Sequence, residues 1–127
     1  HLDQCFLGGI MDSVGFWLMV FDDRRNMIFW NRTAERLSDY CSDEALSPAY
    51  PVLEKLFPGQ AYRESVLERM RRMAFSGEDA PDELATEVAV RGGTRTIAWT
   101  CSLWKSGEEG QSGIIAAGRP VPGNRTA

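Results

Sequence analysis

Few side chains in this sequence offer the chemistry that catalysis or metal binding requires. The one histidine is His1, and the three cysteines, Cys5, Cys41 and Cys101, lie far apart with no metal-ligand spacing. Serine, threonine and cysteine nucleophiles need a neighbouring base, which is most often a histidine. Zinc sites rely on histidines or paired cysteines as well. The sequence therefore predicts a protein that is not an enzyme and binds no metal.

Acidic residues are plentiful, but none forms a pair in an apolar context that would shift its pKa for acid–base catalysis. No glycine-rich phosphate loop is present. The net charge of −4 argues against general nucleic-acid binding. No apolar run approaches the roughly 20 residues of a transmembrane helix. We expect no direct membrane contact and a cytoplasmic location, with any membrane anchor elsewhere in a longer parent protein.

The length of 127 residues predicts one domain. We divide the chain into an N-terminal helical segment at 1–14, a core at 15–121 and a linker or tail at 122–127. The core opens with a strand at Gly15–Asp22 that is apolar on both faces. One face must line the core, and the other needs a cover, either the N-terminal helix or a second subunit. The three residues of one face are Trp17, Met19 and Phe21, and those of the other are Phe16, Leu18 and Val20.

A polar turn and a second strand, Met27–Trp30, follow. Asn26 suits the turn because asparagine tolerates a positive φ. Asn31 is well placed to cap a helix through its side-chain oxygen. The longest predicted helix is Gln60–Ser76, with Glu68 and Arg72 at pairing distance. Its apolar stripe consists of Tyr62, Val66, Met70, Met73 and Ala74.

Three strands are predicted after this helix, at Glu83–Arg91, Thr94–Lys105 and Ser112–Arg119. Gly92 and Gly93 predict the first hairpin turn, since both accept a positive φ. The middle strand alternates cleanly, with Ile97, Trp99, Cys101 and Leu103 on one face. Because strands and helices do not alternate, a parallel sheet is not expected.

This order of elements resembles the PAS family over most of the chain, from about Met11 to Val121. The stretch that resembles the family's hairpin-to-helix signature is MIFWNRTAERLSDYCSDE, and its C-terminal hairpin is similar to VRGGTRTIAWTCSLWKSGEEGQSGIIAAGRPV. The resemblance implies an α+β fold with a five-stranded antiparallel sheet in the order 2-1-5-4-3. Several short helices and one longer helix would cover one face, with a pocket beneath the longer helix.

The resemblance also implies a function. Members of the family act as sensory modules of bacterial signalling proteins, binding a small ligand or dimerising to control an output domain such as a histidine kinase or a diguanylate cyclase. One departure concerns the link to that domain. Arg119-Pro120-Val121 stands where the family often has Asp-Ile/Val-Thr, and Pro122 discourages an immediate helix. Isomerase-like and profilin-like α+β folds are the rival interpretations.

The pocket residues suggested by the resemblance are Asn31, Trp99, Met70, Met73 and Cys101. Histidine-ligated haem is not expected, because the helix Gln60–Ser76 contains no histidine. Covalent flavin is not expected either, and Cys41 is interpreted as a small, partly buried residue. Non-covalent FAD against Trp99, with Asn31 as a polar neighbour, is one alternative to a colourless ligand among the methionines. A ligand-free domain that contacts only a partner chain, most simply as a homodimer, is the other.

Overall fold

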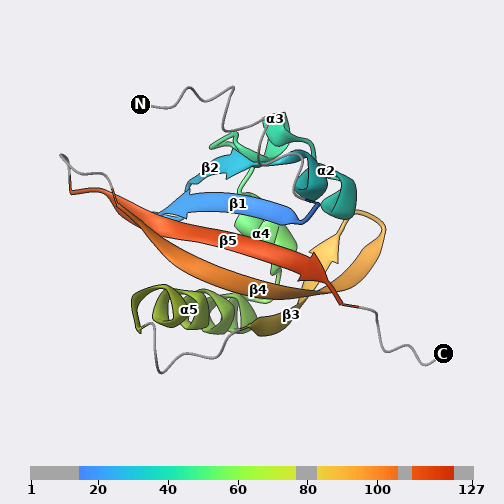
Figure 1. Cartoon of the computed structure of the whole chain (residues 1–127). Helices are drawn as coiled ribbons and strands as arrows, with labels where there is room; N and C mark the ends of the chain where they lie inside the picture. The colour runs from blue at the N-terminus through green and yellow to red at the C-terminus, as the bar shows by residue number, and fades with distance from the viewer. Residues whose placement is uncertain (1–14, 77–82, 106–109, 122–127) are drawn as a thin grey trace.

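The computed structural model describes residues 15–76, 83–105 and 110–121. The segments predicted at 1–14 and 122–127 and the expected linker at Glu78–Asp82 lie outside the described residues. Figure 1 shows the elements in chain order, and their bounds are β1 Trp17–Asp22, β2 Met27–Trp30, α2 Arg32–Ser38, α3 Ser42–Ala45, α4 Val52–Leu56, α5 Gln60–Ser76, β3 Leu84–Val90, β4 Gly93–Lys105 and β5 Ser112–Pro120.

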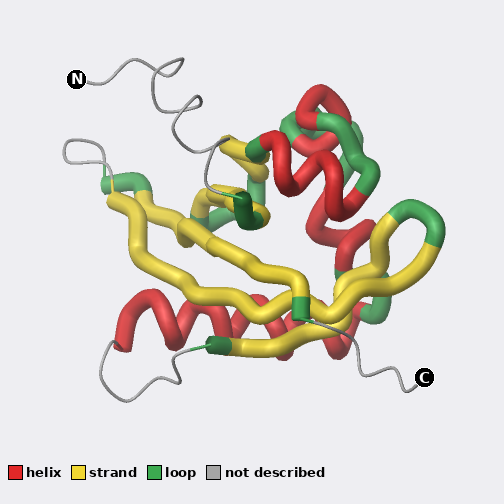
Figure 2. The backbone as a smooth tube through the Cα atoms, turned by 45° about the vertical axis from the view of Figure 1, so that its right-hand side comes forward, coloured by secondary structure: helices red, strands yellow, loops and turns green. Residues whose placement is uncertain are grey.

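The five strands form one antiparallel sheet in the order β2-β1-β5-β4-β3. The first and last strands along the chain therefore pair at its centre, with Trp17 opposite Gly118 and Asp22 opposite Gly113. The smooth tube of Figure 2 shows the sheet as a curved surface along which α5 runs. The α+β class and the strand order predicted from the sequence are confirmed.

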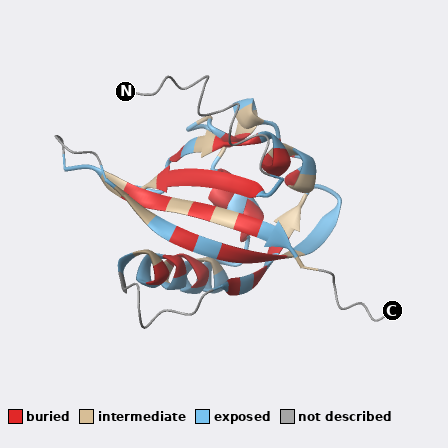
Figure 3. Ribbon diagram, viewed as in Figure 1, coloured by how far each residue is buried: buried red, intermediate tan, exposed pale blue. Residues whose placement is uncertain are grey.

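Strand β1 is buried along almost its whole length, whereas β4 and β5 alternate (Figure 3). Trp17, Met19 and Phe21 belong to the hydrophobic core, which settles which apolar face points inward. On the opposite face Leu18 and Val20 are also buried, while Phe16 is 38% exposed. The sequence predicted that both faces of this strand are apolar, and the structure shows which of them lines the hydrophobic core.

The turn between β1 and β2 differs from the expectation at Asn26. The residue with positive φ is Arg25, at 70°. One oxygen of Asp22 accepts the backbone N–H groups of Arg24 and Asn26, at 3.0 and 2.8 Å, and this Asx-type geometry fixes the turn. The Arg25 guanidinium is held at the same time by Glu64 of α5.

The turn before β4 lies one residue earlier than expected. Gly92 has a φ of 95°, but Gly93 pairs with Val90 as the first residue of β4 and has no positive φ. The two-residue turn is therefore Arg91-Gly92, and only one of the two glycines uses its conformational freedom.

Helix α5 has the predicted bounds, and its predicted Glu68–Arg72 pair is present at 3.2 Å. The prediction for Tyr62 was wrong, because its ring is 45% exposed. Its hydroxyl instead accepts the backbone N–H of Glu87 at 2.9 Å. Since β3 is an edge strand, this bond satisfies an otherwise open backbone group. Leu67, which the predicted stripe did not include, is buried.

The helices pack on the face of the sheet that carries Trp17 and Trp99. One hydrophobic cluster joins that face to α2, α4 and α5, through Ala34, Leu56 and Met70 among others. This places the core between α5 and the sheet, where four of the five predicted pocket residues lie.

Candidate functional site

Four of the five predicted site residues meet in the core between α5 and β4. Trp99 and Cys101 point inward from β4, and Met70 and Met73 face them from α5, all within one hydrophobic cluster. Trp99 and Met70 are fully buried. Periodicity placed the two methionines on one stripe of the helix and Trp99 and Cys101 on one face of the strand, whereas the packing of that stripe against that face was implied by the family resemblance.

Trp99 is fixed by a hydrogen bond and by a close backbone contact. Its indole N–H donates to Thr86 Oγ1 across the β3–β4 pair, at 2.9 Å. Its ring packs on Gly118 of β5, where an added Cβ would lie 2.6 Å from ring atom Cζ3. Only a glycine therefore lets the indole approach β5 this closely.

Trp17 is the core residue that the sequence did not single out. Its ring makes edge-to-face contacts with Trp30 and Trp99, at centroid distances of 5.5 and 5.3 Å. Trp30 donates its indole N–H to the carbonyl oxygen of Tyr40, at 2.9 Å. Trp17 Nε1 is buried and has no hydrogen-bond partner among the residues that the structure describes. Leaving a buried donor unpaired costs about 1–3 kcal/mol.

Asn31 acts as the predicted helix cap and also holds β1. Its Oδ1 accepts the backbone N–H groups of Ala34, at 2.9 Å, and of Leu18, at 3.0 Å. Its Nδ2 donates to the carbonyl oxygen of Phe16, at 2.9 Å. These bonds place Asn31 at the start of α2, in a structural position outside the apolar cluster.

Cys101 has a pKa set by its surroundings. Burial raises the pKa of its thiol from 9.0 to about 12, because the thiolate would lose its hydration. Cys41, by contrast, is exposed, so the expectation that it is partly buried was wrong. Cys41 is the residue that precedes the short helix α3, at the N-terminal end of that helix.

We expect Cys101 to make the fold sensitive to alkali. Between pH 9 and pH 12 the unfolded thiol is ionised while the folded thiol keeps its proton, so the free energy of unfolding falls as pH rises through this window. Urea unfolding at pH about 8 and about 10 should show this fall. The fall in the free energy of unfolding between the two pH values should shrink in Cys101→Ala and persist in Cys41→Ala. An equal fall in both variants would show that Cys101 is not its cause.

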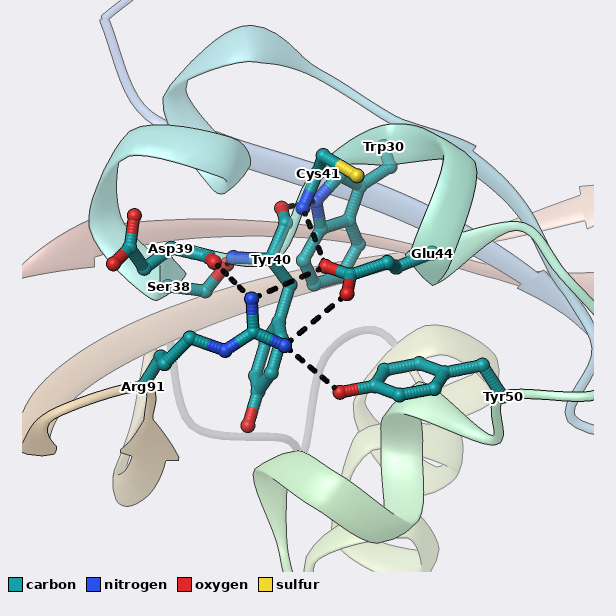
Figure 4. A network of polar contacts seen from close by, with 8 residues as sticks. All are labelled: Trp30, Ser38, Asp39, Tyr40, Cys41, Glu44, Tyr50 and Arg91. Atoms are coloured by element: carbon teal, nitrogen blue, oxygen red, sulfur yellow. Dashed lines mark hydrogen bonds and ion pairs between the residues drawn. The ribbon is translucent and has the colours of Figure 1, made fainter.

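A polar network around Arg91 joins the β3–β4 turn to three points between Asp39 and Tyr50, before, within and after α3 (Figure 4). The Arg91 guanidinium donates to the Asp39 carbonyl oxygen at 3.2 Å, to the Glu44 carboxylate at 3.2 Å and to the Tyr50 hydroxyl at 3.1 Å. It also lies 4.7 Å from the centroid of the Tyr40 ring. The hydrogen bond from Arg91 lowers the pKa of Glu44. These contacts join residues 41 to 52 positions apart, so no local pattern in the sequence predicts them.

Grooves on the surface do not coincide with the predicted pocket. Four grooves, with volumes of about 390, 240, 300 and 460 Å³, are lined by described residues. None of the four is lined by Asn31, Trp99, Met70, Met73 or Cys101. In the described part of the chain these five side chains are packed as core or as a cap.

Known structures resemble this arrangement closely. A PAS domain from Desulfitobacterium hafniense is 12% identical, with a TM-score of 0.65 over 89% of this chain and 99% of that one. A PAS domain from a two-component sensor histidine kinase is 11% identical, with a TM-score of 0.63 over 93% and 96% of the two chains. The chain adopts the PAS fold. The resemblance drawn from the sequence is thereby confirmed at the level of the fold.

A third PAS structure has a bound ligand. The PAS domain of the Cronobacter turicensis quorum-sensing receptor RpfR, in complex with BDSF, is 17% identical, with a TM-score of 0.51 over 87% of this chain and 97% of that one. No protein-family model matches the sequence, and no curated protein matches it.

Among the described residues no helix is long and apolar enough to cross a bilayer. The same residues contain no group of three or more side chains placed to hold a metal ion.

Proposed function

We propose that this PAS domain is a non-catalytic sensory module of a larger bacterial signalling protein, of the histidine kinase or diguanylate cyclase type, and that it works in the cytoplasm. A small ligand in its core would control the output domain. The fold supports this proposal, as do a structural neighbour from a sensor histidine kinase and another that binds BDSF.

The unpaired indole N–H of Trp17 is the observation that carries the ligand proposal. Buried polar groups nearly always have partners, so an orphaned donor in a core needs an explanation. A ligand with a hydrogen-bond acceptor, such as a carbonyl or carboxyl group, would satisfy it. Met70 and Met73 would make room on the α5 side, since thioether chains adopt many rotamers at low cost.

Native mass spectrometry of the freshly purified domain tests this proposal. We expect a second species heavier than the chain by the mass of one small molecule, which disappears after unfolding and refolding. The refolded protein should also gain thermal stability when a size-filtered metabolite extract is added, since a ligand of the folded state stabilises it. A single unliganded mass together with no thermal shift would contradict the proposal.

Non-covalent FAD stays a separate prediction, with Trp99 as its contact. The indole N–H of Trp99 already donates to Thr86, and Asn31 holds β1 and α2, so both would have to exchange a protein partner for the flavin. Absorbance at the flavin bands and flavin release on denaturation would support this alternative, and a colourless protein would refute it.

We also propose that the domain pairs with a second copy through the outer face of its sheet. A groove of about 300 Å³ crosses this face, floored by the small residues Ala98, Thr100 and Ala117 and bordered by Phe16. The groove has room for an apolar side chain of the second copy. Exposed apolar patches of this kind often mark interfaces.

Ala117→Arg is expected to weaken the dimer at least about tenfold, because a guanidinium would be buried without a partner. Light scattering across a concentration series measures the dissociation constant. Thr96→Arg, on the same face but outside the groove, is the matched control and should leave it unchanged. A monomer at all concentrations, or equal effects of the two variants, would refute this dimer.

A further inference from the structure

A groove with no assigned role lies at the end of the molecule formed by α5 and the β1–β2 turn. Its volume is about 390 Å³, within the range of small-molecule sites. The floor is apolar, built by Phe21 of β1, Leu67 of α5 and Ile114 of β5. The groove opens to solvent at the edge of the hydrophobic core, and Trp99, Met70 and Met73 do not line it.

The rim of this groove carries more negative than positive charge. Four carboxylates line it, those of Asp22, Asp23, Glu64 and Glu68, against the two guanidinium groups of Arg25 and Arg71. Both guanidinium groups are paired within the rim, Arg25 with Glu64 at 2.7 Å and Arg71 with Glu68 at 3.2 Å. Arg72, which does not line the groove, also pairs with Glu68 at 3.2 Å. The four carboxylates are therefore opposed by three guanidinium groups, which leaves a net charge of −1 at this rim.

Asp23 is the carboxylate at the rim that takes part in none of these ion pairs. Asp22 is used by the backbone N–H groups of its own turn. The Asp23 side chain is exposed, and it has no hydrogen bond or ion pair among the described residues. A cationic head group could reach it without displacing any contact of the fold.

Phe75 supplies an aromatic surface at the same groove. The residue is 54% exposed, so its ring is open to a bound molecule. The Arg71 guanidinium lies 5.6 Å from the ring centroid, so the face of the ring already attracts a cation. Phe75 and the unpaired carboxylate of Asp23 line the same groove, so one ligand with a cationic head and an apolar body could contact both.

We propose that this groove binds an organic ammonium ion with a short aromatic or alkyl body. The head group pairs with Asp23, and the body lies on Phe75 and the apolar floor. This inference goes beyond the sensory function, because neither Trp17 nor Trp99 lines the groove and its occupation needs no ligand beside them.

Titration with 2-phenylethylammonium, followed by backbone amide NMR, tests the proposal. We expect shifts at Asp23, Leu67, Phe75 and Gly113, with a dissociation constant of about 1 mM for so small a ligand. The neutral analogue 2-phenylethanol and the anion 3-phenylpropanoate should bind at least about fivefold more weakly. Equal shifts from all three compounds, or none at these residues, would overturn the inference.

Two variants separate the carboxylate from the ring. Asp23→Asn should weaken binding of the ammonium at least about fivefold, while Asp43→Asn, an equally exposed aspartate on α3 outside the groove, should leave it unchanged. Phe75→Leu keeps an apolar side chain but removes the ring and should also weaken binding. If the compound shifts the indole N–H of Trp17 and not the groove, the ligand enters the core, which overturns this proposal while supporting the sensory one.

Discussion

Asn31→Ala is expected to lower the free energy of unfolding by about 3 kcal/mol. The substitution removes the cap of α2, which is worth about 1 kcal/mol by itself. It also leaves the buried N–H of Leu18 and the carbonyl oxygen of Phe16 without their side-chain partner, and each such loss costs about 1–3 kcal/mol. One side chain thus ties β1 to the start of α2, which explains the size of the effect.

Urea unfolding measures this loss as a lower midpoint at an unchanged slope. Asn26→Ala is the matched control. Asn26 is exposed and its side chain makes a 3.3 Å bond to Asp22, so we expect a loss below about 1 kcal/mol. Asn31→Asp keeps the accepting oxygen, so its free energy of unfolding should lie between those of the wild type and Asn31→Ala. If Asn31→Ala loses no more stability than Asn26→Ala, the hydrogen bonds of the Asn31 side chain contribute little.

Gly118→Ala is the second large expected effect, at about 2–3 kcal/mol. A Cβ there would lie 2.5 Å from Ile97 Cγ2 and 2.6 Å from Trp99 Cζ3, well inside contact distance. Trp99 cannot easily withdraw, because its indole N–H is bound to Thr86 and Trp17 packs against its ring. The new methyl group must therefore displace the indole or open the β4–β5 pair.

Near-ultraviolet circular dichroism and urea unfolding together measure this displacement. Gly93→Ala is the matched control, since its Cβ would meet no atom within 4 Å and its φ is not positive. Trp99→Phe should relieve part of the clash, so the double variant should lose less than the sum of the two single losses. Strict additivity would show that Gly118 and Trp99 do not share this contact.

The sequence predicted those parts of the fold that depend on local pattern. The period of α5 gave its exact bounds, and Asn31 could be recognised as a cap because its side chain binds a residue only three positions away. Gly92 and Gly93 located a hairpin, although the choice of Gly92 for the positive φ depends on strand register. The strand order came from the family resemblance rather than from any local signal.

The features that the sequence missed depend on pairs far apart along the chain. Tyr62 lies on the apolar stripe by spacing, but it faces the edge of β3, 25 residues away, and is exposed there. Within residues 15–76, 83–105 and 110–121, no acceptor from another element reaches the indole N–H of Trp17. Arg91 and Glu44 form a pair that only the folded chain brings together. Such contacts leave no periodic signal in the sequence.

The indole N–H resonances of the domain test its proposed sensory function most directly. Natively purified protein and protein stripped by unfolding and refolding would be compared by nitrogen–proton NMR. We predict that the Trp17 resonance differs between the two preparations and returns when a size-filtered metabolite extract is added, while that of Trp104, on the outer face, stays unchanged. Identical Trp17 resonances in all three samples would contradict a ligand in the core.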